Sequence, residues 1–201
     1  MGRSDIFNLL GDYILRGLLT YISILASIIV VLVILGTKND GVSQVENVAY
    51  PENELQFMSI VRDAASEATK ANDLRKGEIV KARNSMICNI LNNKEIYKWH
   101  GTISDISSTL SEDAIVEIKL PDGTKVGTWN NVVSDAGDNT IISKNSDVFN
   151  DIYELSIGDK VLFSGSFVSD KYQCARETSL TKEGGLLSPE FLFKFSSIEK
   201  I

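Results

Sequence analysis

The sequence predicts a mainly β protein with helices, in which an N-terminal transmembrane helix and a leading helix or helix pair precede a small β-barrel. Three observations lead to this fold class. Residues 17–36 form an uncharged apolar run, residues 51–92 carry apolar side chains at helical spacing, and from residue 97 apolar and polar residues alternate as in strands. A chain of 201 residues has room for one membrane segment and one ordinary domain.

The apolar run reads GLLTYISILASIIVVLVILG, which is 20 residues without a charge. A helix rises about 1.5 Å per residue, so this run would span about 30 Å, the hydrocarbon thickness of a bilayer. A cleaved signal peptide is the alternative. The run is longer than a usual signal core, however, and its last three residues, ILG, offer only one of the two small residues that cleavage requires. We therefore expect an uncleaved anchor that contacts the lipid bilayer through residues 17–36.

Positive charge flanking the run predicts the orientation of the chain. Arg3 and Arg16 precede the run, whereas only Lys38 follows closely. Because positive residues favour the cytoplasmic side, residues 1–16 are expected in the cytoplasm. The domain that follows would then lie outside it, in the periplasm of a bacterium whose inner membrane carries the anchor.

The charge balance disfavours nucleic acid as a partner. The formal net charge is −7, and the charged residues before the apolar run cancel, so the whole excess falls on the soluble part. Nucleic-acid binders gain affinity from clustered Lys and Arg that displace counterions, and no such cluster is visible in the sequence. A protein or a small ligand is the expected partner.

A polar linker, residues 37–50, separates the anchor from a helical segment, residues 51–92. Pro51 suits the start of a helix, and Glu52 and Glu54 would lie in the first turn, where acids favour the helix dipole. The polar pair at residues 72–73 and the glycine at 77 interrupt the apolar pattern. One long helix and two shorter helices therefore both remain open.

Strand patterns follow, with one short helix among them. We expect strands at residues 97–104, 114–120, 124–129, 160–167, 171–180 and 191–198, and a helix at 148–155. The turn sequence PDG separates the second and third strands. Three strands, a helix and then further strands is the order of the OB-fold, a small barrel. Gly101 and Gly165 in mid-strand suit its sharp coiling, so residues 97–201 are predicted to form an OB-fold-like β domain.

Four stretches of the domain carry a family resemblance: TWNNVVSDAGDNTII, VLFSGSF, ARETSLTKEGGLLSPEF and FKFSSI. They resemble an uncharacterised bacterial family of membrane-anchored OB-fold proteins, of the type called tRNA_anti-like. The resemblance covers about residues 57 to 198. It implies the fold and a bacterial origin, but no activity, because none is established for that group.

The chain has two cysteines, Cys88 in the helical segment and Cys174 in a late expected strand. In an oxidising compartment they could form a disulfide that closes a loop of about 86 residues, worth about 4 kcal/mol in the chain-entropy model. Two separate buried thiols are the alternative. His100 is the only histidine, so neither a catalytic triad nor a His-rich metal site is expected, and we expect it at the surface of a strand.

The most polar segment of the chain covers residues 130–151. Its candidate ligand-binding residues, with the preceding tryptophan, are Trp129, Asn130, Asn131, Asp135 and Asp138. Trp129 could stack on a ring or a sugar, although we favour a place in the core. Clustered acids can hold a hard cation, but their spacing does not match an EF-hand, and Asn and Asp are common in loops. Loop structure is therefore the preferred interpretation, and no metal ligands are assigned.

These features predict a membrane-anchored, non-catalytic binding or interaction module without a cofactor. A metal-dependent hydrolase that uses the acids of residues 130–151 is one alternative. A structural component of an envelope complex, with the leading helix as a contact surface, is another. Homo-oligomerisation stays open in all three cases.

Overall fold

The computed structural model describes residues 49–91 and 95–201. The expected membrane segment, residues 17–36, and most of the linker lie outside the described residues. Among the helices that are described, none combines the length and the apolar character needed to cross a membrane.

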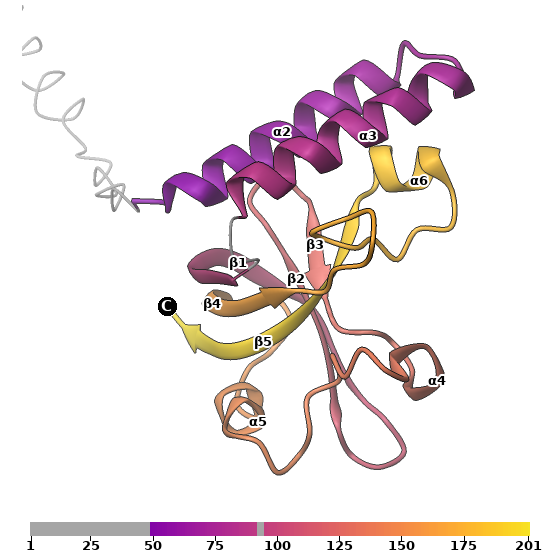
Figure 1. Ribbon diagram of the computed structural model, residues 1–201. Coiled ribbons are helices and arrows are strands. Elements are labelled where there is room, and N and C mark those ends of the chain that lie inside the picture. Colours follow the sequence, from indigo (N-terminus) through magenta and orange to yellow (C-terminus); the bar gives the residue numbers. More distant parts are fainter. Residues whose placement is uncertain (1–48, 92–94) are drawn as a thin grey trace, which may run out of the picture. The chain divides into compact units, whose positions relative to one another are not determined.

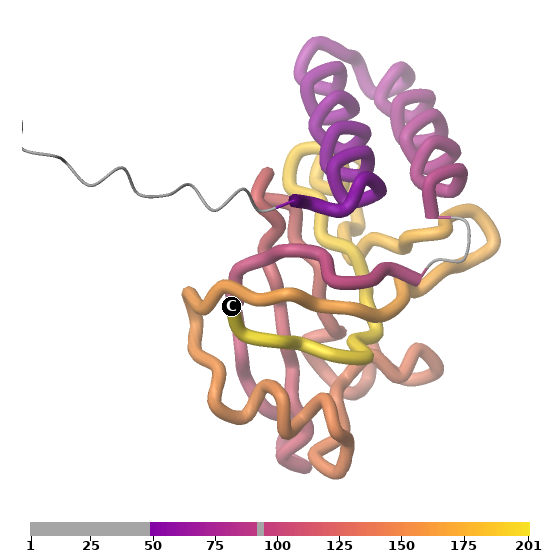
Figure 2. The backbone as a smooth tube through the Cα atoms, turned by 90° about the vertical axis from the view of Figure 1, so that its left-hand side faces the viewer, coloured from indigo at the N-terminus to yellow at the C-terminus, as the bar shows by residue number. Residues whose placement is uncertain are grey.

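The helical segment contains two helices, α2 (Glu52–Ala68) and α3 (Asp73–Ile90). Asn72 begins α3, because its side chain accepts a hydrogen bond from the backbone N–H of Arg75 and so satisfies one of the unpaired donors of the first turn. The two helices lie side by side above one end of the barrel (Figures 1 and 2).

The barrel consists of five strands: β1 (Glu95–Ser108), β2 (Ala114–Lys119), β3 (Lys125–Gly127), β4 (Lys160–Phe167) and β5 (Glu190–Lys200). They close in the order β1-β2-β3-β5-β4, and β3 pairs with β5 in parallel while all other pairs are antiparallel. The structure thus confirms the expected mainly β domain with helices and a small barrel. The expected strand at residues 171–180 is wrong, because this segment is a loop joined to β5 by one isolated bridge, Glu177 to Phe191.

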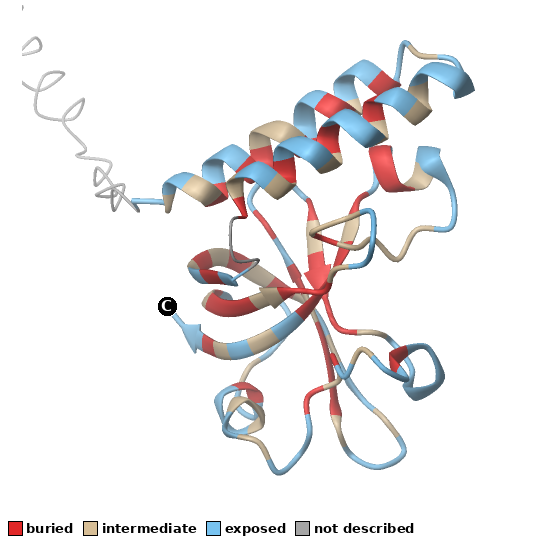
Figure 3. Ribbon diagram, viewed as in Figure 1, coloured by how far each residue is buried: buried red, intermediate tan, exposed pale blue. Residues whose placement is uncertain are grey.

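Aromatic side chains fill the barrel, and helices cover its ends. Phe57 projects from α2 into the core, where its ring centroid lies 5.2 Å from those of Trp99, Phe167 and Phe191. Full burial of such a side chain contributes about 1.5–3 kcal/mol. The buried face of α2 is therefore covered by the barrel at Phe57, Met58 and Val61 and by α3 and α6 (Lys182–Leu187) at Ala64 and Ala68, while the opposite face is exposed (Figure 3).

Three short helices lie in the connections: α4 (Val132–Asp135), α5 (Asp147–Ile152) and α6 (Lys182–Leu187). The helix α5 packs against β5 and buries Ile152 in the same core, at the barrel end opposite α2 and α3 (Figure 1). The helix α6 contacts α2 and α3.

Two mid-strand glycines allow the barrel to coil, as the sequence predicts. A Cβ at Gly101 would collide with the side chain of Ile118 on β2, and one at Gly165 would collide with the carbonyl oxygen of Lys194 on β5. Gly165 also has a φ of +151°, which side chains disfavour. Both positions therefore require glycine for a close approach between strands.

Candidate functional site

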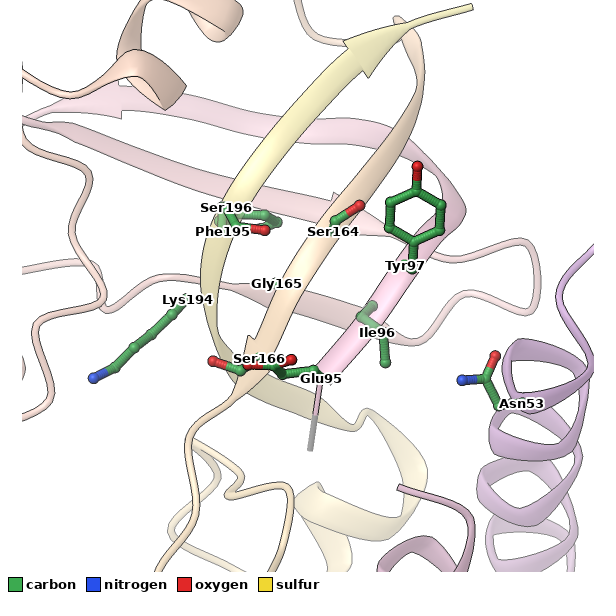
Figure 4. Close-up of a pocket in the computed structure, with 10 residues that line it drawn as sticks. All are labelled: Asn53, Glu95, Ile96, Tyr97, Ser164, Gly165, Ser166, Lys194, Phe195 and Ser196. Carbon is green, nitrogen blue, oxygen red and sulfur yellow. The ribbon is translucent and has the colours of Figure 1, made fainter. Parts of the chain in front are cut away.

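The β4 groove is a hollow on the outside of the barrel with a volume of about 570 Å³. Residues 164–166 of β4 form its floor, residues 95–97 of β1 and 194–196 of β5 form its walls, and Asn53 of α2 stands at one end (Figure 4). This volume lies within the usual range for a ligand site, about 300–1,000 Å³.

The floor is low because β4 carries small residues at this point. Along β4 the buried Phe163, Gly165 and Phe167 alternate with Ser164 and Ser166, which line the groove. Ser166 is partly exposed, whereas Ser164 is buried at 6% exposure. The strand pairs with β1 on one side and β5 on the other, and both pairings shift register beside the groove. The shift in β1 places Lys98 at a φ of +51°, and its backbone N–H donates to Ser164 Oγ at 3.1 Å.

The walls combine an aromatic ring with two opposite charges. The Tyr97 ring stands at the β1 wall and is 71% exposed, which is unusual for a large side chain on a barrel strand. Glu95 on β1 and Lys194 on β5 are exposed as well, and each contributes one charge of opposite sign. The groove therefore combines polar and apolar groups, is electrically balanced, and offers an aromatic face for stacking.

Helix α2 is fixed against β1 by two side chains of its first turn. The Asn53 Oδ1 accepts a hydrogen bond from Trp99 Nε1 at 3.0 Å. Next to it, Glu54 accepts the backbone N–H of His100 on Oε1 at 3.0 Å, and its Oε2 lies 3.1 Å from His100 Nδ1. These contacts hold the Asn53 end of the groove in place.

The expectation that His100 is a surface residue is wrong. Its side chain is 13% exposed, it contacts the fully buried Glu54, and its ring centroid lies 4.5 Å from that of Tyr50. Burial raises the pKa of Glu54, although hydrogen bonds from His100 and its charge when protonated oppose this shift.

The sequence-predicted ligand residues lie after β3 and outside the lining of the β4 groove. Trp129 is partly buried rather than part of the core: its indole N–H donates to Asp138 Oδ2 at 2.8 Å, and the Arg176 guanidinium lies over its ring. Arg176 also forms an ion pair with Asp138. Asn130 and Asn131 are exposed, and the Asn131 side chain caps α4. The structure thus brings Trp129 and Asp138 together, without the two asparagines.

Asp135 braces the loop that contains it. Its Oδ1 accepts from the backbone N–H and the hydroxyl of Thr140 at 2.6 and 2.7 Å, and its Oδ2 accepts from the Ile141 N–H at 3.2 Å. Within residues 49–91 and 95–201, no three His, Cys, Asp or Glu side chains are grouped so that they could hold a metal ion. The Asp135 carboxylate thus serves loop structure, the interpretation that the sequence analysis preferred for this segment.

A disulfide joins Cys88 of α3 to Cys174 of the loop between β4 and α6, with the Cα atoms 5.2 Å apart. The fully buried Arg83 of α3 makes a second link to this loop, because its Nη1 lies 2.9 Å from Oε1 of Glu177, whose side chain is 10% exposed. The same Nη1 donates to the carbonyl of Gly185 on α6 at 2.8 Å. Burial raises the pKa of Glu177, and Arg83 opposes that shift. These links attach the loop to the helix pair.

No family model, curated protein or solved structure matches this chain. The resemblance to the tRNA_anti-like group therefore stays a prediction from sequence motifs. The sequence analysis also did not anticipate the β4 groove. Two features of the sequence could have indicated it: the run of small residues SGS in the fourth barrel strand, and the tyrosine that begins YKWHG. Nothing in the sequence shows, however, that these two segments meet.

Proposed function

We propose that this chain is a membrane-anchored, non-catalytic binding module whose domain, an OB-fold barrel, lies on the outer side of a bacterial inner membrane. The observation that carries the proposal is the β4 groove: a preformed hollow with an exposed aromatic ring, hydroxyl groups and an amide, at a fixed place on a packed barrel. Such a surface is suited to binding.

The strand order supports the OB-fold assignment. A five-stranded barrel in the order β1-β2-β3-β5-β4, with helices between β3 and β4, has the element order expected of that fold. Fold alone does not name a ligand. The anchor and the outer location rest on the apolar run at residues 17–36 and on the positions of Arg3 and Arg16.

Two other functions receive less support from the described residues. A metal-dependent hydrolase would need free carboxylates near residues 130–151, but Asp135 is bonded to Thr140 and Asp138 to Trp129 and Arg176. An envelope scaffold would need an exposed apolar stripe on the leading helix. The stripe of α2, which includes Phe57, Met58 and Val61, is buried against its own barrel.

Photo-cross-linking in intact cells tests the proposal. A diazirine amino acid placed at Lys194, on the groove wall, should form an adduct that disappears when Ser166→Trp fills the floor. The matched control is the same diazirine at Tyr153, which is exposed and outside the groove lining. Equal adduct formation at both positions, or adducts that persist with Ser166→Trp, would contradict a binding role for the groove.

A further inference from the structure

The chemistry of the β4 groove indicates which class of ligand it takes. We infer that the groove binds a neutral oligosaccharide. This inference rests on the proposed binding function of the same groove. It depends on three properties of the groove: its charge balance, its donors and acceptors, and the pairing of its floor strand.

The charge balance disfavours an ionic ligand. One carboxylate, Glu95, and one ammonium group, Lys194, line the groove, so its formal charge is zero. A strand of nucleic acid requires a positively charged track along its phosphates. A ligand without net charge is therefore favoured.

The groups on the floor and walls match the hydroxyls and ring faces of a sugar. Ser166 and Ser196 offer hydroxyls that both donate and accept. The Asn53 Oδ1 is engaged by Trp99, whereas its amide nitrogen has no hydrogen-bond partner among the described residues and can donate. Tyr97 supplies an exposed aromatic face with a polar tip, on which the apolar face of a sugar ring can stack. A wholly apolar ligand would leave these donors and acceptors without partners.

The pairing of the floor strand disfavours an extended peptide. Peptides that add to a sheet need a strand with free backbone N–H and C=O groups. The β4 strand already pairs with β1 through residues 95–102 and with β5 through residues 193–200. A ligand on this floor therefore meets side chains rather than a free strand edge, as a sugar chain would.

The test is a titration of the full-length chain, held in a detergent without a sugar headgroup, and followed by amide chemical shifts in NMR spectra. The probes are maltotetraose, cellotetraose and chitotetraose. We expect at least one of them to shift groove resonances at concentrations up to about 10 mM, the range of weak binding. Tyr97→Ala should weaken that binding by about tenfold, whereas Tyr97→Phe should retain it.

Matched variants guard against a trivial loss of fold. Tyr153→Ala removes an equally exposed ring outside the groove and should bind as the unmodified chain does. Ser166→Trp should abolish binding while the amide chemical shifts of residues outside the groove stay those of the unmodified chain. Equal affinities of Tyr97→Ala and Tyr153→Ala would overturn the inference.

A tetra-alanine peptide and an oligothymidine in the same assay separate this inference from the proposed function. Groove shifts with either of these, and none with the three sugars, would overturn the saccharide class while supporting a binding groove. Absence of shifts with the sugars up to about 10 mM overturns the inference in any case. The cross-linking experiment then decides independently whether the groove binds another ligand.

Discussion

The buried carboxylate of Glu54 on α2 holds two groups of one residue, the backbone N–H and the imidazole Nδ1 of His100 on β1, at 3.0 and 3.1 Å. His100 lies in the part of β1 that pairs with β4 along one edge. Along the other edge, pairing with β2 begins only at Thr102, so no described strand lies beside His100 there. A strand edge of this kind needs a partner for its backbone groups. Glu54 supplies that partner and so attaches the helix to the barrel.

This pair makes stability depend on pH in a defined direction. Because burial raises the pKa of Glu54, the folded state binds more protons than the unfolded state between the unfolded and the folded pKa. The contribution of this group to the free energy of unfolding is therefore greatest at low pH and is lost as pH rises through the folded pKa. Urea unfolding of the unmodified chain and Glu54→Gln from pH 4 to 8 measures this.

The difference in unfolding free energy between the two chains should shift in favour of Glu54→Gln as pH rises, because Gln keeps an acceptor for the His100 N–H without a charge. Glu54→Ala should cost about 1–3 kcal/mol, since it leaves that N–H without a partner. A difference that stays constant over the pH range would contradict the raised pKa.

The buried ion pair between Arg83 and Glu177 predicts strong non-additivity. Arg83→Met leaves the Glu177 carboxylate unpaired in a buried site, which should cost about 3–5 kcal/mol. Glu177→Leu should cost a similar amount, because it leaves the buried Arg83 guanidinium without its ion-pair partner. The double variant should be much closer to the unmodified chain, because well-packed apolar side chains can replace a buried pair. Chemical denaturation of all four chains provides the cycle, and additive losses would argue against a coupled pair.

The disulfide should contribute to stability through the size of the loop it closes. Cys88 and Cys174 are 86 residues apart. The chain-entropy model gives about 4 kcal/mol for such a loop, as an upper-end value. Cys88→Ser combined with Cys174→Ser should lower the free energy of unfolding by up to that amount, and reduction of the unmodified chain should do the same. A denaturation midpoint that does not respond to reductant would speak against the bridge.

Thiol labelling in intact cells tests the orientation of the anchor. With a reagent that cannot cross the inner membrane, Cys88 and Cys174 should react only after reduction, because the bridge would then lie outside the cytoplasm. A denatured sample controls for thiols that are merely buried. Labelling that requires permeabilised membranes would reverse the orientation predicted from Arg3 and Arg16.

The contact between Trp129 and Asp138 should order the loop after β3. Asp138→Ala removes the acceptor of the indole N–H and the partner of Arg176. We expect a loss of about 1–3 kcal/mol, since the half-buried donors lose a charge-assisted partner. The emission of Trp129 should also move to longer wavelength. Asp147→Ala, at the start of α5, is the matched control and should leave the emission unchanged.

Local pattern was sufficient for most elements of this domain. Alternating residues in KVLFSGSF and helical spacing in ENELQFMSIV determine β4 and α2, because strand and helix periods are properties of a few neighbouring residues. The same reasoning failed for residues 171–180. That segment has the residue types of a strand, but its pairing with β5 is limited to one bridge with two backbone hydrogen bonds, and the Cys88–Cys174 bridge and Arg83 hold it as well.

The sequence by itself determined the kind of each main element, their order along the chain and the acidic, histidine-poor chemistry of the domain. The tertiary structure decided what the side chains do. His100 is partly buried because the edge of β1 beside it has no β2 partner, and Glu54 of α2 covers that edge. The groove exists because Tyr97, the serines of β4 and Lys194 meet across three strands. These relations join residues far apart in sequence, and pairing register, which is a property of the closed barrel as a whole, fixes them.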